Sequence, residues 1–149
     1  MVCCWWFVNF EEKSIWQPLQ NLKTWKSGNW QLARELSKEI YSLTFVDPIK
    51  SDYRLKDQMR GSAGSIMDNI AEGFERGSKL EFINSLGYSK GEVGELKSQL
   101  YRSLDNKYFS QEIFDDLYNK ADIITKKITA FITYLNASKL KGQKFKNRT

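Results

Sequence analysis

The 149-residue sequence predicts an all-α fold, an antiparallel up-down-up-down four-helix bundle. Apolar residues recur at three- and four-residue steps along four long stretches, and short breaks with proline, glycine or serine separate these stretches. No strand-like alternation, long loop or internal repeat interrupts them. A chain of this length can bury a core without disulfides or a metal, so we expect one bundle domain over 27–137.

A proline separates the first two helices. The first helix is predicted from Trp30 to about Phe45, ahead of Pro48, and the second over 51–76. Gly77 is suited to the left-handed conformation that ends a helix. The inward stripes of these two helices are Ala33, Leu36, Ile40 and Leu43, followed by Leu55, Met59, Ala63, Ile66, Ile70 and Phe74.

A serine precedes each of the last two helices. Ser78 and Glu81 have the spacing of a capping box at the start of a helix over 79–105, and Ser110 is the expected cap of the last helix. Long helices joined by such short links must be antiparallel neighbours. The inward stripes are Phe82, Leu86, Val93, Leu96 and Leu100, followed by Ile113, Leu117, Ala121, Ile124, Ile128, Phe131 and Leu135.

Small residues crowd the second helix, and the third carries Gly87, Gly91 and Gly94 on one face. Each glycine inside a helix costs about 0.5–1 kcal/mol relative to alanine. Three such costs on one face indicate a close contact, either with the second helix or between subunits. The residues predicted for this helix or subunit interface are Gly61, Ala63, Gly64, Asn69, Glu72, Gly87, Gly91, Gly94 and Glu95.

The first 26 residues show no sustained period but hold four of the five tryptophans, Trp5, Trp6, Trp16 and Trp25. We interpret 1–26 as an irregular arm. Tryptophan side chains bury a large area when they find a groove, so the arm is expected to lie across the bundle or to dock on another subunit or partner. The alternative is a poorly ordered extension upstream of the domain.

The basic charge of the chain is concentrated at its end. The formal net charge is +5, and residues 138–149 contain five basic residues and no acidic one. The remaining 18 basic residues equal the 18 acidic ones. We predict a disordered tail that is drawn to phosphates, and the alternative is a solubilising end.

The composition argues against an enzyme. Histidine is absent, which removes the commonest general base and zinc ligand, and the only cysteines, Cys3 and Cys4, are adjacent. A catalytic pair among Glu72, Glu81 and Glu95 would need burial to raise one pKa, and capping or interface hydrogen bonds explain these residues better. We therefore expect no catalytic residue, cofactor, metal or small-molecule substrate. Reduced cysteines suit the cytoplasm, and the apolar opening is far shorter than the roughly 20 residues of a membrane span.

The basic residues favour nucleic-acid binding. Phosphate contacts need only positive charge, whereas reading a base sequence needs more. Lysines on helix surfaces also serve solubility, so a solvated face is the alternative. The candidate nucleic-acid-binding residues are Lys56, Arg60, Arg76, Lys79, Lys90, Lys97, Lys139, Lys141, Lys144, Lys146 and Arg148.

A further set of residues forms a recognisable pattern of order and spacing along the first three predicted helices. Its members are Trp30-Gln31, Ala33, Leu36, Ile40-Tyr41, Pro48, Tyr53, Gln58-Met59-Arg60, Ser65-Ile66, Asn69-Ile70-Ala71-Glu72-Gly73, Ser78-Lys79, Glu81-Phe82, Gly91, Glu95-Leu96 and Gln99-Leu100. In this pattern the chain resembles the four-helix-bundle proteins encoded in intervening sequences of bacterial 23S ribosomal RNA genes. That family includes the accessory variability determinants of diversity-generating retroelements. The resemblance covers about 30–136.

Three positions depart from the family pattern. Gly61 replaces a second basic residue, Glu92 replaces the usual serine, and Ser85 replaces a larger apolar residue. The first two changes weaken a nucleic-acid surface. The resemblance implies a homo-oligomeric ring, typically a pentamer, that acts without catalysis as a scaffold for RNA or DNA, together with a reverse transcriptase in the retroelement branch. The alternative function is a protein-binding adaptor that uses the tryptophan-rich arm.

Overall fold

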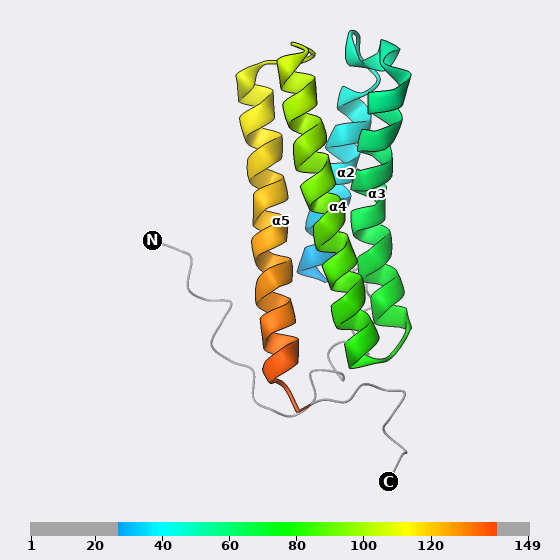
Figure 1. The fold of residues 1–149 in the computed structure, drawn as a ribbon, viewed down its shortest axis with the longest axis vertical. Coiled ribbons are helices and arrows are strands. Elements are labelled where there is room, and N and C mark those ends of the chain that lie inside the picture. Colours follow the sequence, from blue (N-terminus) through cyan, green and yellow to red (C-terminus); the bar gives the residue numbers. More distant parts are fainter. Residues whose placement is uncertain (1–26, 140–149) are drawn as a thin grey trace.

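A computed structural model describes residues 27–139, and the elements of this region are all helical (Figure 1). The four long helices are α2 (Gly28–Leu43), α3 (Tyr53–Glu75), α4 (Lys79–Asp105) and α5 (Gln111–Ala137), and a short 3-10 helix, η2 (Ile49–Ser51), lies between α2 and α3. The predicted all-α four-helix bundle is confirmed. None of the helices in this region is long and apolar enough to cross a membrane. The predicted arm, 1–26, and the residues 140–149 of the predicted tail lie outside the described residues.

The helices run in alternating directions and close into a four-sided bundle. Each long helix packs against the next one along the chain, and α2 also packs against α5 (Figure 1). A polar side chain caps the start of every long helix, as the N-H groups of the first turn require. The caps are Ser27, Asp52, Ser78 and Ser110, whose oxygens accept hydrogen bonds from the backbone N-H groups of Trp30, Leu55, Glu81 and Ile113. Gly77, with a φ of 68°, takes the predicted left-handed conformation between α3 and α4.

The predicted apolar stripes meet in one continuous core. The stripes of α3 and α4 are buried as expected, apart from Phe74, which is half-buried. One position on α5 was predicted wrongly, because Ile113 is 40% exposed and Phe114 is buried in its place. The two side chains point about 100° apart on a helix, so only the position of the neighbouring helices decides which one enters the core.

The close approach of α3 and α4 occurs at Gly73. A Cβ atom on Gly73 would lie 2.4 Å from the Cβ atom of Ser85, so glycine is what allows these helices to meet there. Farther along the same two helices, the hydroxyl of Ser89 donates a 2.9 Å hydrogen bond to the carbonyl oxygen of Ile66, and Gln99 Nε2 donates a 3.0 Å hydrogen bond to Ser62 Oγ. Small and polar side chains therefore do bring α3 and α4 together.

The glycines predicted to make this contact do not make it. A Cβ atom on any of them would find no atom of the described chain within 4 Å, and they are Gly61, Gly64, Gly87, Gly91 and Gly94. The prediction that the glycines of α4 meet α3 within one chain is wrong. Gly87 and Gly94 directly follow the core residues Leu86 and Val93, so they are rotated by about 100° away from the core. The alternative, a contact between subunits, stays a prediction.

Candidate nucleic-acid interface

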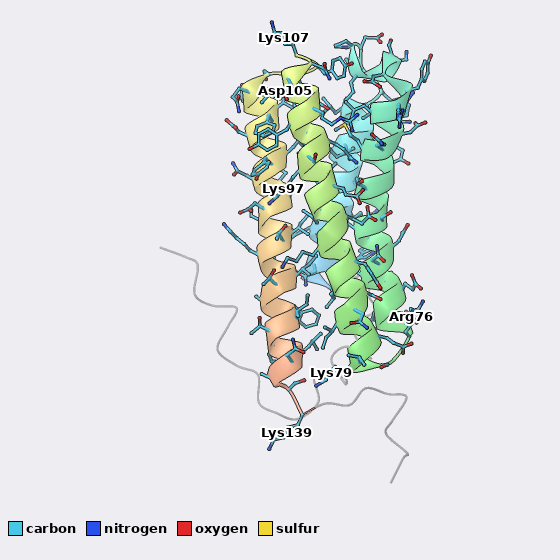
Figure 2. All side chains as sticks on the ribbon, in the orientation of Figure 1. Arg76, Lys79, Lys97, Asp105, Lys107 and Lys139 are labelled. Carbon is cyan, nitrogen blue, oxygen red and sulfur yellow. The ribbon has the colours of Figure 1, made fainter. Side chains whose placement is uncertain are left out.

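The basic residues predicted on the helices do not gather on one face. Lys97 lies midway along α4 on the side of α5, whereas Arg76 and Lys79 lie at the end where α3 joins α4 (Figure 2). Lys56 and Arg60 lie toward the opposite end, in the first half of α3. Phosphate binding along one groove would need these charges side by side. Lys56, Arg60, Arg76, Lys79 and Lys97 are therefore spread along the bundle, and Lys90 is exposed on α4.

Arg60 holds the end of α2. Its Nε donates a 2.8 Å hydrogen bond to Thr44 Oγ1, and its Nη2 donates a 3.4 Å hydrogen bond to the carbonyl oxygen of Thr44. Thr44 is the C-cap of α2, where carbonyl groups lack partners within the helix and attract positive charge. Arg60 therefore has a structural role that the sequence alone did not indicate, because residues 44 and 60 meet only in the folded chain.

Three of the predicted basic residues lie at the end of the bundle from which the chain continues into its last residues. Arg76 forms ion pairs with Glu72 and, at 3.7 Å, with Glu81, and its hydrogen bond to Glu72 raises the pKa of Arg76. Lys79 Nζ donates a 2.9 Å hydrogen bond to the carbonyl oxygen of Ser138, which ties the start of α4 to the end of α5.

Lys139 follows Ser138 and therefore lies at the same end of the bundle as Lys79 and Arg76 (Figure 2). Lys141, Lys144, Lys146 and Arg148 follow in the sequence and lie outside the described residues. The structure thus brings together the basic residues of the α3–α4 link and the first residue of the basic tail.

Lys97 is committed to an ion pair between α4 and α5. Its Nζ lies 2.9 Å from Asp122 Oδ1 and 4.8 Å from the centre of the Tyr118 ring. Lys126 Nζ lies 2.8 Å from the other oxygen of the same carboxylate. The hydrogen bonds from Lys126 and Lys97 lower the pKa of Asp122 to about 2. This arrangement stabilises the bundle and leaves Lys97 poorly placed for a phosphate.

We expect Asp122→Asn to lower the melting temperature at pH 7. The pKa of Asp122 is about 2 in the folded chain and about 3.9 in an unfolded one, so its charged form stabilises the fold above about pH 4. That contribution is lost as the pH falls from about 4 towards 2, and the difference between wild type and variant should shrink over this range. Thermal unfolding at several pH values measures it. Asp68→Asn, at an exposed site on α3, is the control; an equal loss in both variants at pH 7 would contradict the prediction.

The remaining residues predicted for an interface have different surroundings. Ala63 is fully buried in the core, and Asn69 Nδ2 donates a 2.8 Å hydrogen bond to the carbonyl oxygen of Ser65. Glu72 is paired with Arg76, and Glu95 is exposed on α4. Burial, followed by the nearby charge of Glu95, raises the pKa of Glu92. Of these residues, Ala63 is the one that lies in the core of the described chain.

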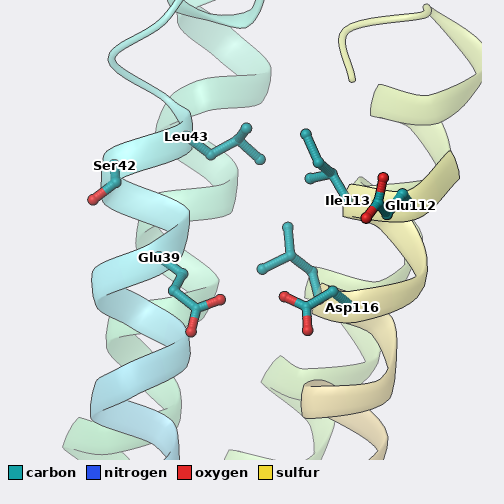
Figure 3. Close-up of a pocket in the computed structure, with 7 residues that line it drawn as sticks. Glu39, Ser42, Leu43, Glu112, Ile113 and Asp116 are labelled. Atoms are coloured by element: carbon teal, nitrogen blue, oxygen red, sulfur yellow. The ribbon is translucent and has the colours of Figure 1, made fainter. Parts of the chain in front are cut away.

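An open groove, which was not predicted from the sequence, lies between α2 and α5. Figure 3 shows Leu43 facing Ile113 across it, with Glu39 and Asp116 below them. The groove has a volume of about 440 Å³. Lys120 Nζ lies 2.6 Å from both Glu39 Oε2 and Asp116 Oδ2. The hydrogen bond to Asp116 has the largest effect on the pKa of Lys120, the bond to Glu39 the second largest, and both raise it.

Two of the carboxylates beside the groove are engaged in ion pairs. A general acid and base need carboxylates with separated pKa values facing a substrate. Glu39 and Asp116 instead share one ammonium group, which holds them together as a structural bridge. Within residues 27–139, no group of three or more His, Cys, Asp or Glu residues is placed to hold a metal ion. Apolar side chains line the groove, namely Leu43, Ile113 and Leu117.

Comparison with known proteins identifies relatives of this bundle. Residues 26–130 match the family model described as 23S rRNA-intervening sequence protein. Among solved structures, the chain is similar to a protein with unknown function from the S23 ribosomal protein family, from Bacteroides thetaiotaomicron. That similarity has a TM-score of 0.66 and 23% sequence identity, and it covers 70% of this chain and 95% of the other. At this identity it establishes the fold alone. No curated protein matches the sequence.

Proposed function

The chain belongs to the 23S rRNA-intervening sequence protein family, as its sequence predicted, and on this premise we propose that it is a non-enzymatic, oligomeric scaffold that binds RNA or DNA. Its expected partners are nucleic acid and either a reverse transcriptase or a ribosomal RNA, and its expected compartment is the cytoplasm. No metal, cofactor or small-molecule substrate belongs to this proposal. The bundle supplies a rigid support, and the charge for phosphate binding comes mainly from the basic tail.

One observation carries the nucleic-acid part of the proposal. The hydrogen bond from Lys79 to Ser138 holds the residue before Lys139 beside Lys79, at the end of the bundle where α3 joins α4. The sequence from Ser138 to Thr149 contains five basic residues and no acidic residue. Clustered lysines and arginines bind the phosphate backbone without reading its sequence. A scaffold with such a cluster is expected to bind nucleic acids of many different base sequences.

The oligomeric part of the proposal is supported by the glycines of α4. Gly87, Gly91 and Gly94 lie on one helix, and the described part of the chain leaves the space above each of them empty. Glycine is an expensive choice at three such positions unless another backbone approaches. We propose a closed ring of identical subunits, with a pentamer favoured, in which this face meets the next subunit. A ring would also multiply a weak basic cluster into an avid one.

Removing residues 139–149 is expected to weaken RNA binding by about tenfold or more at low salt. Each phosphate contact with a single strand contributes about 0.7 to the slope of log affinity against log salt concentration, so the loss of five charges should lower that slope by up to about 3.5. Fluorescence anisotropy with a labelled RNA, over a series of salt concentrations, measures both quantities. Ser138 is retained so that its contact with Lys79 survives.

A second full-length variant separates charge from length. Replacing Lys139, Lys141, Lys144, Lys146 and Arg148 with glutamine should reproduce the effect of the deletion. An affinity that is indifferent to salt in the wild-type protein would overturn the nucleic-acid proposal. So would equal RNA binding by the wild-type protein and both variants.

A second candidate function, a protein-binding adaptor, is favoured by the groove between α2 and α5. Its apolar lining and carboxylate rim suit a peptide with apolar and basic side chains. The tryptophan-rich arm is the other surface proposed for a protein partner, and it lies outside the described residues. A protein partner that co-purifies and is lost on deletion of 1–26, with no RNA retained, would select the adaptor over the nucleic-acid scaffold.

A further inference from the structure

The link from α2 to α3 lies at one end of the bundle (Figure 1). Large apolar side chains are exposed at this end. Tyr53 is 72% exposed, Phe45 and Val46 are each 62% exposed, and Tyr41 is 45% exposed. Exposed clusters of this kind mark interaction surfaces, because covering an aromatic ring removes a large apolar area from water. Tyr41, Phe45 and Tyr53 are called the aromatic end.

A cation lies over each ring of the aromatic end. Lys56 Nζ is 4.4 Å from the centre of the Tyr53 ring, and the guanidinium carbon of Arg60 is 4.9 Å from the ring centre of Tyr41 and 4.5 Å from that of Phe45. Lys56 and Arg60 are one turn apart on α3, so they lie on the same side of the helix. The three rings and two cations therefore form one strip across the end of α2 and the start of α3.

Two more cations, Lys50 and Arg54, are exposed on the same segment. Within residues 27–139, no carboxylate forms an ion pair with Lys50, Arg54, Lys56 or Arg60. By contrast, Arg76 and Lys120 elsewhere on the bundle are each held by two carboxylates. Lys56 and Arg60 donate to neutral oxygens instead, Lys56 to the carbonyl oxygen of Lys50 at 3.3 Å and Arg60 to Thr44, so their positive charge is not paired with a carboxylate.

Three carboxylates share this segment: Asp52 and Asp47 accept hydrogen bonds from the chain itself, and Asp57 is exposed on α3. Asp52 accepts a 3.0 Å hydrogen bond from the N-H group of Leu55 and another of 3.0 Å from the hydroxyl of Tyr108, and the first of these lowers the pKa of Asp52. Asp47 accepts a 2.8 Å hydrogen bond from the hydroxyl of Ser51. These hydrogen bonds hold the two carboxylates at the cap of α3 and in the link but leave their negative charge in place. The four cations Lys50, Arg54, Lys56 and Arg60 therefore exceed the three carboxylates of this segment by one charge.

We propose that the aromatic end binds a single-stranded nucleic acid, with bases stacked on Tyr53 and Phe45 and phosphates beside the surrounding cations. This inference rests on the proposed nucleic-acid function and names the form of nucleic acid that this surface takes. Aromatic rings beside a basic track are the combination that holds single strands with little regard to sequence. A duplex keeps its base faces stacked inside and cannot offer them to these rings.

Full-length Tyr53→Ala and Phe45→Ala are each expected to bind a labelled single-stranded RNA 12-mer about fivefold or more weakly than the wild-type protein does. The salt dependence of binding should stay the same, because replacing an uncharged ring removes no phosphate contact. Tyr53→Phe keeps the ring and should retain wild-type affinity. Tyr88→Ala is the matched control, since Tyr88 is a 68% exposed tyrosine on α4. Fluorescence anisotropy measures the wild-type protein and the four variants against the single strand and against its duplex.

Three results would overturn the proposal for the aromatic end. The first is that Tyr53→Ala and Phe45→Ala bind the single strand as tightly as Tyr88→Ala does, while the wild-type protein also binds it. The nucleic-acid function would then remain, but without the aromatic end. The second is a preference for the duplex. The third is a change of subunit number in light scattering on replacing Phe45 or Tyr53, which would make this surface a contact between protein chains. A wild-type protein that binds neither form would instead remove the nucleic-acid function itself.

Discussion

Gly73→Ala is expected to lower the free energy of unfolding by about 1–3 kcal/mol. The new methyl group would lie 2.4 Å from Ser85 Cβ and 2.8 Å from Ser85 Oγ. The position of a Cβ atom is fixed by the backbone, so a change of rotamer at Ser85 cannot relieve the clash and α3 must move away from α4. The better helix propensity of alanine offsets only about 0.5–1 kcal/mol of this cost. Chemical denaturation followed by circular dichroism measures the difference.

A second change tests whether the contact with Ser85 is the cause. Ser85→Gly removes the Cβ atom on the other side, so the double variant should recover part of the stability lost in Gly73→Ala. Gly64→Ala is the control on the same helix, because a Cβ atom there would meet nothing within 4 Å in the described chain. A Gly73→Ala protein as stable as the wild type, or a double variant with purely additive losses, would contradict this account.

The helices could be predicted because their signals are local. Ser78 and Ser110 accept hydrogen bonds from N-H groups only three residues further along the chain. Gly77 lies directly between two helices. Short stretches of sequence are therefore enough to place these helix ends. The core stripes follow from the helical period, which is a property of each helix alone. The same period could not decide between Ile113 and Phe114, because that choice depends on where α2 and α4 lie.

The contacts between helices were harder to predict for the same reason. The glycines of α4 correctly indicated one shared face, but spacing along one helix does not say what that face meets. Arg60 was predicted to bind nucleic acid, and its bonds to Thr44 arise only when α2 and α3 are folded together. The aromatic end was missed because Tyr41 and Tyr53 belong to different helices, and each alone looks like an ordinary surface tyrosine.

Replacing Gly87, Gly91 and Gly94 together with alanine is expected to have opposite effects on the single chain and on its assembly. In the described chain the three methyl groups would meet nothing within 4 Å, so each should stabilise α4 by about 0.5–1 kcal/mol, or about 1.5–3 kcal/mol in total. In a ring with a neighbouring backbone packed on this face, the same groups would force the subunits apart. Light scattering should then show smaller particles, while denaturation at concentrations where the chain is monomeric shows a more stable bundle.

The two readouts separate the fold from the proposed ring. Gly28→Ala is the matched control, because a Cβ atom on this first residue of α2 also meets nothing within 4 Å in the described chain, and it should leave the subunit number unchanged. A triple variant that keeps the wild-type subunit number would move the subunit contact away from this face. A wild-type protein that is monomeric would remove the ring and the avidity expected from it. A triple variant whose single chain is destabilised would show that α4 meets a neighbour in its own chain after all.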